Sequence, residues 1–597
     1  MWSVANSTVA FLFSSFGFFS QSPDLIAQTS FGQLEGVASQ SRTGRAVFEF
    51  LGVPYAHPPV GSLRFKPPVL WNESWEGVRD ATSDTPRCVQ YHLIARHFSG
   101  SEDCLFLFLY THKFQKVGED PIPATELKPV VVYIHGGLFM QGSGLFYKGK
   151  YFLDEDVVFV SMQYRVGALG FLNLETDDVP GNVGLMDQVA ALKWIQENIH
   201  YFGGDPNLVT IMGESAGSTA VHLHILSPMS RGLFHRAISQ SGTALVSWAV
   251  RDHPVEQAKY FADRLGCPTD TAQNISNCLR NMDATVIGRA HMEAATILHH
   301  RYSLFGPTIE SRSESAIPKF LPDRPDKIIK AGHIAKVPWI CGANSEEGLL
   351  YAAPMVLNKT ARREINENWS HWMPITFRFV DEPNKEEISN KIREFYFGNV
   401  STEINKTNLR KLITFVTDRS FMEGLHHTLN LHKGQHPVYP YLYSYRGQFS
   451  FGRIMLGMTF NVPIMVDFLY SQSKRWVKTK VFRREEEHFG TTHGDELPLF
   501  FNLPLQDIAK KEHPDYILST TLVKSWAEFA RDGVPPLMNG EVWQDLSAEN
   551  TIDGSAKSPA LQFLKIDKEF ETIDEPFQAR AEFWESLKIY PEREYYQ

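Results

Sequence analysis

Leu208-Val-Thr-Ile-Met-Gly-Glu-Ser-Ala-Gly217 is the most informative stretch of this 597-residue chain. Its first half is short, apolar and β-branched, which predicts a strand, and the residues from Ala216 through Leu226 have the spacing of a helix. Ser215 would then lie at the tip of a sharp strand-to-helix turn, with glycines where the neighbouring backbone passes too close for a Cβ. The pentapeptide alone would also fit a buried serine in a glycine-rich turn. The surrounding sequence must therefore distinguish such a structural serine from a nucleophile.

A second pair of glycines supports a catalytic reading of that turn. The apolar segment Pro129-Val-Val-Val-Tyr-Ile134 predicts a buried strand, and it leads directly into His135-Gly-Gly-Leu-Phe139. The N–H groups of Gly136 and Gly137, with that of Ala216, would hold the negative oxygen of a tetrahedral intermediate. A plain tight turn is the alternative, but the order of the two motifs, about eighty residues apart, favours an oxyanion hole.

Composition limits the function classes. The net charge of −10 and the absence of a basic stripe argue against a nucleic-acid partner. We find no linker, repeat or low-complexity run, and no apolar segment long enough to span a membrane beyond the N-terminus. The apolar core Val9-Ala-Phe-Leu-Phe13 predicts a signal peptide at residues 1–22, although a basic start is missing. Residues 23–597 would form a single domain.

Cysteines and glycosylation sequons indicate the secretory pathway. Cys88 and Cys104 are sixteen positions apart and Cys267 and Cys278 are eleven apart, spacings that suit small loops, whereas Cys341 lies in an apolar, strand-like segment. Five reduced cysteines in a cytosolic enzyme are the alternative. Sequons oppose it, and we expect a secreted or secretory-lumen glycoprotein. The sequons begin at Asn72, Asn274, Asn358, Asn368, Asn399 and Asn405.

A nucleophilic serine also needs a base and a carboxylate that orients the base. His493 lies in a polar loop late in the chain, next to a glycine, and is the best candidate among twenty-two histidines. Glu347 is the candidate acid because it follows the apolar strand that contains Cys341. Spacing alone does not separate Glu347 from Glu346.

Many further motifs, in order along the chain, resemble the type-B carboxylesterases, the family that includes cholinesterases, liver carboxylesterases and insect juvenile hormone esterases. The resemblance covers nearly everything from about residue 30 to residue 590. The motifs that carry it include Phe50-Leu-Gly-Val-Pro-Tyr-Ala56, Glu102-Asp-Cys-Leu105, Tyr164-Arg-Val-Gly-Ala-Leu-Gly-Phe171, Gly181-Asn-Val-Gly184, Phe202-Gly-Gly-Asp-Pro206, Gln240-Ser-Gly242, Glu347-Gly348, His493-Gly-Asp-Glu496 and Trp526-Ala-Glu-Phe-Ala530.

The resemblance implies an α/β-hydrolase fold: a central, mostly parallel sheet flanked by helices, with large insertions that form a gorge over the serine. It makes Ser215 the nucleophile, His493 the base and Glu347 the acid, in preference to Glu346. It also implies that both close cysteine pairs are disulfides, that Trp248 lines the acyl pocket, and that Arg165 and Asp187 form an ion pair. No metal or organic cofactor is needed for such a serine carboxylesterase, whose partner is a small-molecule ester.

Departures from the family pattern concern the substrate. Cholinesterases carry a choline-binding tryptophan inside the first disulfide loop, and the segment 89–103 has none. We therefore expect hydrolysis of small, largely uncharged esters through an acyl-enzyme. Hormone or choline ester hydrolysis, and a non-enzymatic cell-surface binding role, are the alternatives. Residues from about 451 to 480 resemble an insertion, to which the sequence assigns no role, and oligomeric state is equally open.

Overall fold

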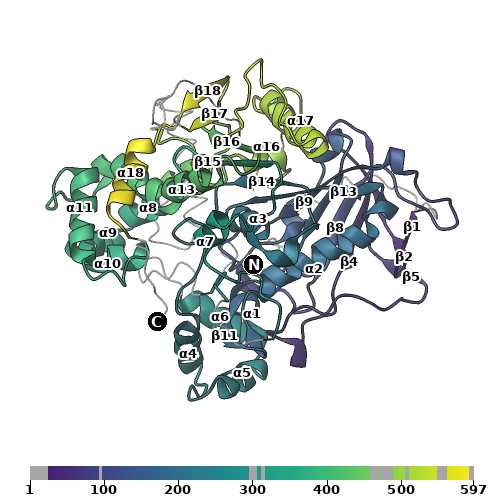
Figure 1. The fold of residues 1–597 in the computed structure, drawn as a ribbon, viewed down its shortest axis with the longest axis horizontal. Coiled ribbons are helices and arrows are strands. Elements are labelled where there is room, and N and C mark those ends of the chain that lie inside the picture. The colour runs from purple at the N-terminus through teal and green to yellow at the C-terminus, as the bar shows by residue number, and fades with distance from the viewer. Residues whose placement is uncertain are drawn as a thin grey trace, which may run out of the picture.

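The computed structural model describes residues 25–92, 97–294, 305–310, 316–457, 470, 473, 488–503, 508, 510–547 and 561–589. An eleven-stranded mixed sheet runs through its centre (Figure 1). Seven adjacent strands, from β17(Gln562–Ile566) to β10(Val158–Met162) in the order given below, are parallel to one another, while the strands outside them pair antiparallel. This confirms the predicted α/β-hydrolase class. The strand order is β18(Phe570–Asp574), β17(Gln562–Ile566), β16(Val438–Tyr443), β15(Trp339–Asn344), β14(Arg236–Gln240), β13(Gly204–Glu214), β9(Lys128–Ile134), β10(Val158–Met162), β8(Phe106–Thr111), β4(Ala46–Pro54) and β3(Val37–Gln40).

Alternation of side chains along the central strands builds two cores, one on each face. Val130, Val132 and Ile134 of β9 belong to the core that contains helices α2(Val183–Asn198) and α3(Ala216–Leu226). The intervening Val131 and Tyr133 belong to the opposite core, which contains α17(Tyr516–Asp532). Strands covered on both faces are apolar throughout, which is why the β9 and β13 segments lack an alternating polar pattern.

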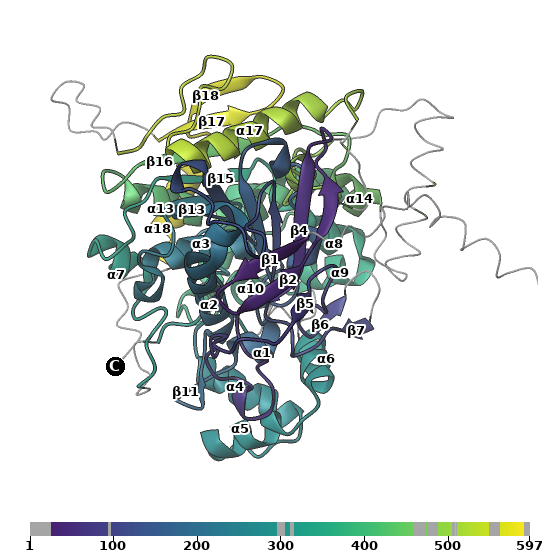
Figure 2. The ribbon, with the colours of Figure 1, turned by 90° about the vertical axis from the view of Figure 1, so that its right-hand side faces the viewer.

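Two groups of helices lie outside these layers. The first, with its own apolar core, gathers at one end of the sheet (Figure 1). It contains α8(Leu349–Leu357), α9(Lys359–Glu367), α10(Trp369–Thr376), α11(Lys385–Phe397), α12(Leu409–Thr417) and α18(Gln578–Ser586). The second consists of α4(Pro254–Arg264), α5(Ala272–Arg280) and α6(Ala284–Ala294). A small three-stranded sheet of β1(Ile26–Thr29), β2(Gly32–Glu35) and β5(Val78–Asp80) is separate from the main sheet and lies on the side of the molecule that faces the viewer in Figure 2.

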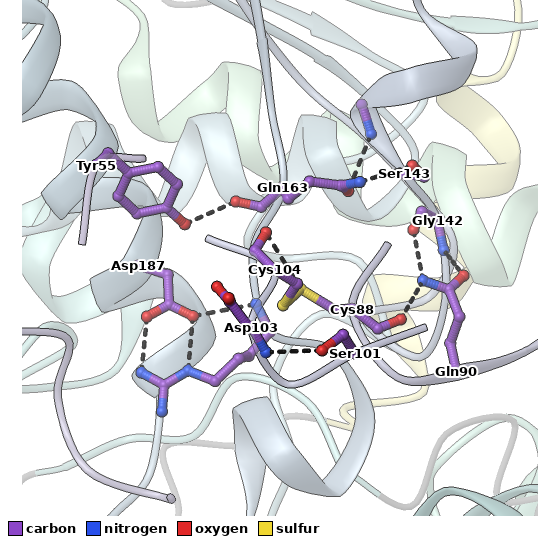
Figure 3. Close-up of a disulfide and its surroundings, with 12 residues drawn as sticks. Tyr55, Cys88, Gln90, Ser101, Asp103, Cys104, Gly142, Ser143, Gln163 and Asp187 are labelled. Carbon is purple, nitrogen blue, oxygen red and sulfur yellow. Dashed lines mark hydrogen bonds and ion pairs between the residues drawn. A yellow bond between two sulfur atoms is a disulfide. The ribbon is translucent and has the colours of Figure 1, made fainter. Parts of the chain in front are cut away.

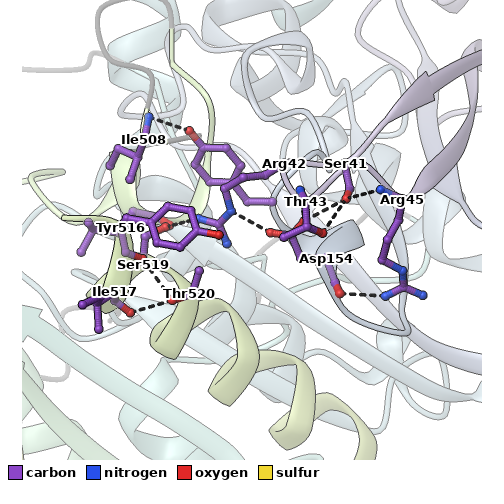
Figure 4. A network of polar contacts seen from close by, with 12 residues as sticks. Ser41, Arg42, Thr43, Arg45, Asp154, Ile508, Tyr516, Ile517, Ser519 and Thr520 are labelled. Carbon is purple, nitrogen blue, oxygen red and sulfur yellow. Dashed lines mark hydrogen bonds and ion pairs between the residues drawn. The ribbon is translucent and has the colours of Figure 1, made fainter. Parts of the chain in front are cut away.

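A buried ion pair joins the N-terminal strands to a late helix. Nε of Arg42 donates to Asp154 at 2.7 Å, and its Nη1 donates to Oγ of Ser519 on α17 at 2.6 Å (Figure 4). The guanidinium also lies 4.3 Å from the ring centre of Tyr151. Segments 477 positions apart are therefore fixed to each other by one side chain.

Three buried imidazoles form a continuous chain of hydrogen bonds beneath β15. The amide of Ala244 donates to Nδ1 of His222, and His222 Nε2 lies 3.0 Å from His432 Nε2. Nδ1 of His432 lies 2.7 Å from Nε2 of His436, whose Nδ1 contacts the carbonyl of Val337 at 2.8 Å. The chain joins α3, α13(Glu423–His432) and the segment before β15.

The structure extends or corrects several local expectations. The strand expected around Cys341 runs on to Asn344, so the loop with Glu347 starts three residues later than the apolar pattern indicates. His222, His224 and His432 lie in helices, as expected for most histidines other than His493, and the structure adds that they are fully buried. Cys88–Cys104 and Cys267–Cys278 form disulfides, and Cys341 is a buried free thiol.

The expected signal peptide lies outside the described residues, as does most of the insertion at 451–480. No helix in the described part of the chain is long and apolar enough to cross a membrane.

Candidate active site

Ser215 lies between β13 and α3 in a strained backbone conformation. Its φ of 60° and ψ of −124° fall outside the regions that side-chain-bearing residues normally occupy. The turn is tight because a Cβ on Gly217 would come within 2.0 Å of the carbonyl oxygen of Ile134, and one on Gly213 within 2.4 Å of Gly217. Side chains at these two positions would force the turn open, so the glycines maintain the sharp turn at Ser215.

The predicted oxyanion glycines lie directly opposite this turn. A Cβ on Gly136 would stand 3.0 Å from Cβ of Ser215, and Gly137 has a φ of 109° that favours glycine. Within the described part of the chain, no hydrogen bond between backbone groups uses the N–H of Gly136, Gly137 or Ala216. These three donors therefore remain available beside the serine.

The Cys88–Cys104 disulfide loop supports the loop that carries these glycines. The side-chain amide of Gln90 donates to the carbonyl of Gly142 at 2.7 Å, and the amide of Gly142 donates back to Gln90 at 2.8 Å (Figure 3). Gln163 donates to Ser143 at 2.9 Å in the same region. The expected ion pair is nearby, since two guanidinium nitrogens of Arg165 donate to Asp187 at 2.7 and 2.8 Å.

Glu347 and His493 are in direct contact. Nδ1 of His493 donates to Oε2 of Glu347 at 2.7 Å, and the other carboxylate oxygen accepts the backbone N–H of Asn344 at the same distance. Glu347 is fully buried and His493 is 8% exposed. Both carboxylate oxygens are therefore engaged, which fixes the orientation of the imidazole.

The far side of the imidazole faces Glu214, the residue directly before Ser215. Nε2 of His493 lies 3.2 Å from Oε1 of Glu214. Burial alone would lower the pKa of His493, but Glu214 and Glu347 outweigh it and raise that pKa to about 9. Burial raises the pKa of Glu214 to about 7 even though His493 opposes the shift. No local pattern in the sequence predicts this contact of Glu214, whose position directly before the serine is the only indication of it.

Glu346 has a different set of partners from Glu347. Its Oε2 accepts the backbone N–H of Thr491 at 2.9 Å, and its own amide donates to the carbonyl of Thr491. Its carboxylate also accepts a short hydrogen bond from Ser345. The described contacts of Glu346 thus hold the start of the histidine loop and do not reach the imidazole.

A pocket that opens to solvent lies beside this centre. Its lining includes Leu138, which follows the oxyanion glycines, and Trp248, the predicted acyl-pocket residue. Nε1 of Trp248 donates to the carbonyl of Ser420 at 2.9 Å. Ser420 belongs to a π-helical turn, Asp418–Met422, that also places Phe421 4.9 Å from the ring of His493. Turns of this kind are frequent at functional sites, but the sequence gives no pattern that predicts one.

The six predicted glycosylation asparagines differ in their exposure to solvent. Asn72, Asn274, Asn368 and Asn399 are exposed, and Asn358 and Asn405 are half-buried. Among the described residues, no group of three or more His, Cys, Asp or Glu side chains is arranged to hold a metal ion.

Several known proteins are similar in sequence to this chain over most of its length. Residues 23–584 match the carboxylesterase family. Esterase FE4 of Myzus persicae is 35% identical over 567 residues, which cover 93% of this chain and 90% of that protein. Juvenile hormone esterase of Tribolium castaneum is 34% identical, over 88% of this chain and 86% of its own length. Neuroligin-2 of Mus musculus is 29% identical over 94% of this chain and 67% of its own length.

Proposed function

The chain belongs to the carboxylesterase family and hydrolyses carboxylic esters, and we propose that Ser215, His493 and Glu347 are the residues that carry out this reaction. The observation that carries the assignment is the 2.7 Å contact between His493 and Glu347, with the imidazole facing the residue next to Ser215. The neuroligin similarity would fit a binding role, but the presence of all three side chains favours the enzyme.

The proposed mechanism follows from the chemistry of these groups. His493 removes the proton of the Ser215 hydroxyl as its oxygen attacks the ester carbonyl. The N–H groups of Gly136, Gly137 and Ala216 stabilise the tetrahedral oxyanion, a contribution of about 3 kcal/mol for each donor. The alcohol then leaves with a proton from His493, and a water activated by His493 releases the acid from Ser215. Glu347 holds the imidazole and stabilises its protonated form throughout.

We propose small, largely uncharged esters as the substrate class. A quaternary ammonium group needs an aromatic face, which is worth up to about 2 kcal/mol when desolvated. The first disulfide loop offers Tyr91 and Phe98, and these two rings pack against each other at 5.0 Å. Trp248 beside the pocket, as the acyl-pocket residue, suits an apolar acyl group.

We also propose that the protein enters the secretory pathway. Two disulfides and four exposed sequon asparagines support this location, because both modifications are made there. Protein expressed in insect cells should lose mass on treatment with a peptide N-glycosidase, and unchanged mass would contradict the proposal.

One series of measurements tests the catalytic assignment. The wild-type protein should hydrolyse aryl acetates and butyrates faster than choline esters of equal acyl size. Ser215→Ala should lower kcat on the order of 10⁴-fold or more while the fold is retained. An organophosphate should label one peptide, the one that contains Ser215. Labelling of another serine, or more than a few per cent activity in Ser215→Ala, would exclude Ser215 as the nucleophile.

A further inference from the structure

Asp495 is a buried carboxylate two residues after His493 that makes three hydrogen bonds. Its Oδ2 accepts from Oγ of Ser450 at 2.8 Å and from the backbone N–H of Thr492 at 3.0 Å. Its Oδ1 accepts the backbone N–H of Phe451 at 2.7 Å. One side chain thus connects the residue before His493 to a segment more than forty positions earlier in the chain.

The segment held by Asp495 packs directly against the histidine loop and the loop of the catalytic acid. Phe451 begins the short helix α14(Phe451–Gly457). A Cβ on Gly452 would come within 2.5 Å of Leu349, which begins α8 just after Glu347, and within 3.3 Å of Thr492. The N–H of Leu350 donates to Oγ1 of Thr492 at 3.1 Å, so α14, α8 and the histidine loop meet at one point.

From this geometry we infer that Asp495 is a positioning residue for the catalytic histidine: its three hydrogen bonds hold α14 against Thr492 and thereby keep the imidazole of His493 on Glu347. The inference rests on the proposed function. It also assigns a role to the first part of the segment for which the sequence indicated none.

An asparagine at this position cannot reproduce the bonding. Its amide oxygen can replace either Oδ1 or Oδ2, and its NH₂ group then faces an N–H donor that needs an acceptor. If the oxygen faces Phe451, Thr492 and Ser450 lose their acceptor; if it faces Thr492, Phe451 loses it. The histidine loop and α14 would then separate slightly, and displacement of a catalytic group by about 1 Å lowers rates by up to about 100-fold.

The test compares Asp495→Asn with wild type at about pH 8.5, where a carboxyl whose pKa burial raises to about 7 is ionised. Active sites are first counted by stoichiometric organophosphate labelling, so that loss of folded protein is separated from loss of turnover. We expect kcat per active site on a neutral aryl ester to fall about 10- to 100-fold with little change in KM. The acid limb of the kcat/KM profile should also move to lower pH, because an imidazole displaced from Glu347 loses the interaction that raises its pKa.

Asp515→Asn is the matched control. Asp515 is another buried acid, and it accepts hydrogen bonds from Tyr445 and from the N–H of Gln448 at 2.8 Å, a few residues before Ser450. These hydrogen bonds go to residues 445 and 448, and we expect kcat per active site to remain near that of wild type. Equal losses in the two variants would overturn the inference, as would an unchanged kcat per active site in Asp495→Asn.

Ser450→Ala keeps the inference testable if Asp495→Asn does not fold. This variant removes one of the three hydrogen bonds, and we expect a smaller fall in kcat per active site, about two- to fivefold, again without a change in KM. A value equal to that of wild type would contradict the inference. Absence of ester hydrolysis in the wild-type protein would instead contradict the proposed function, so the two failures are distinct.

Discussion

At the scale of single residues, the imidazole of His493 lies between two carboxylates, 2.7 Å from Glu347 and 3.2 Å from Glu214. Together they raise its pKa to about 9 against the opposing effect of burial. A histidine can act as a base only when neutral, so the free enzyme should be most active on the alkaline side of neutrality. Glu214 thus contributes a charge that shifts the working pH of the site.

We predict that Glu214→Gln moves the acid limb of the kcat/KM profile to lower pH by about one unit or more, because one of the two charges that favour the imidazolium is removed. Stopped assays with a neutral aryl ester between pH 5 and 10 would measure it. Substitution of the exposed Glu367 by glutamine is the control and should leave the limb in place. A limb that stays in place, or moves to higher pH, in Glu214→Gln would show that this carboxylate does not act on His493.

The neighbouring acids Glu346 and Glu347 should respond very differently to the same substitution. Glu347→Gln should lower kcat by about 10⁴-fold, since a misoriented imidazole is a poor base. Glu346→Gln should lower it less than about tenfold, because the amide oxygen can still accept the N–H of Thr491. Rates of organophosphate labelling at Ser215 give an independent measurement. A severe loss in Glu346→Gln with a mild one in Glu347→Gln would reverse the assignment of the acid.

At the scale of secondary structure elements, the chain of His222, His432 and His436 affects stability through pH. Burial lowers the pKa of all three, to about 3 for His222. The folded protein therefore binds protons at these positions less readily than the unfolded chain, whose histidines titrate near pH 6.5. Their contribution to stability is complete above about pH 6.5 and decreases as the pH falls, by up to about 1.4 kcal/mol per pH unit for each histidine.

We predict that His432→Gln makes the free energy of unfolding less dependent on pH. Between about pH 6.5 and 5 the slope should decrease by up to about 1.4 kcal/mol per pH unit relative to wild type, since one proton-binding group of the unfolded chain is removed. Urea unfolding at several pH values would measure the slope. The exposed His333→Gln is the control and should leave it unchanged. Parallel curves for His432→Gln and wild type would contradict the prediction.

Elements with strong local patterns could be predicted from the sequence, and contacts between distant segments could not. The helix α3 and the strand β9 coincide with the segments expected from apolar spacing to within one residue. The contact of Glu214 with His493 joins residues 279 positions apart, and no periodicity encodes it. The π-helical turn at 418–422 and the buried histidines depend in the same way on tertiary packing. Local context indicated His493 and the Glu346–Glu347 pair, family resemblance selected Glu347 over Glu346, and the catalytic roles remain predictions.

At the scale of the whole molecule, the Arg42–Asp154 pair ties the N-terminal strands to α17 near the other end of the chain. We predict that Asp154→Asn lowers the free energy of unfolding by about 3–5 kcal/mol, because it leaves a buried guanidinium without a countercharge. The urea midpoint would report the loss, while kcat per active site should be unchanged.

The neighbouring exposed pair provides the control. Arg45 and Asp156 lie in the same region, and their side chains are 40% and 63% exposed. Asp156→Asn should therefore cost less than about 1 kcal/mol. Similar losses in the two variants would mean that burial does not determine the contribution of these pairs.

The histidine chain has a direction that its end groups impose. The amide of Ala244 can only donate, so Nδ1 of His222 must accept and its proton lies on Nε2. That proton points at Nε2 of His432, and each following ring donates from Nδ1 until the carbonyl of Val337 accepts the last one. A nitrogen-15 NMR spectrum should accordingly contain one Nε2–H tautomer and two Nδ1–H tautomers from this chain. Their imidazole protons should exchange slowly with deuterium oxide, and the nitrogen shifts should stay constant across the pH range in which solvent-exposed histidines titrate.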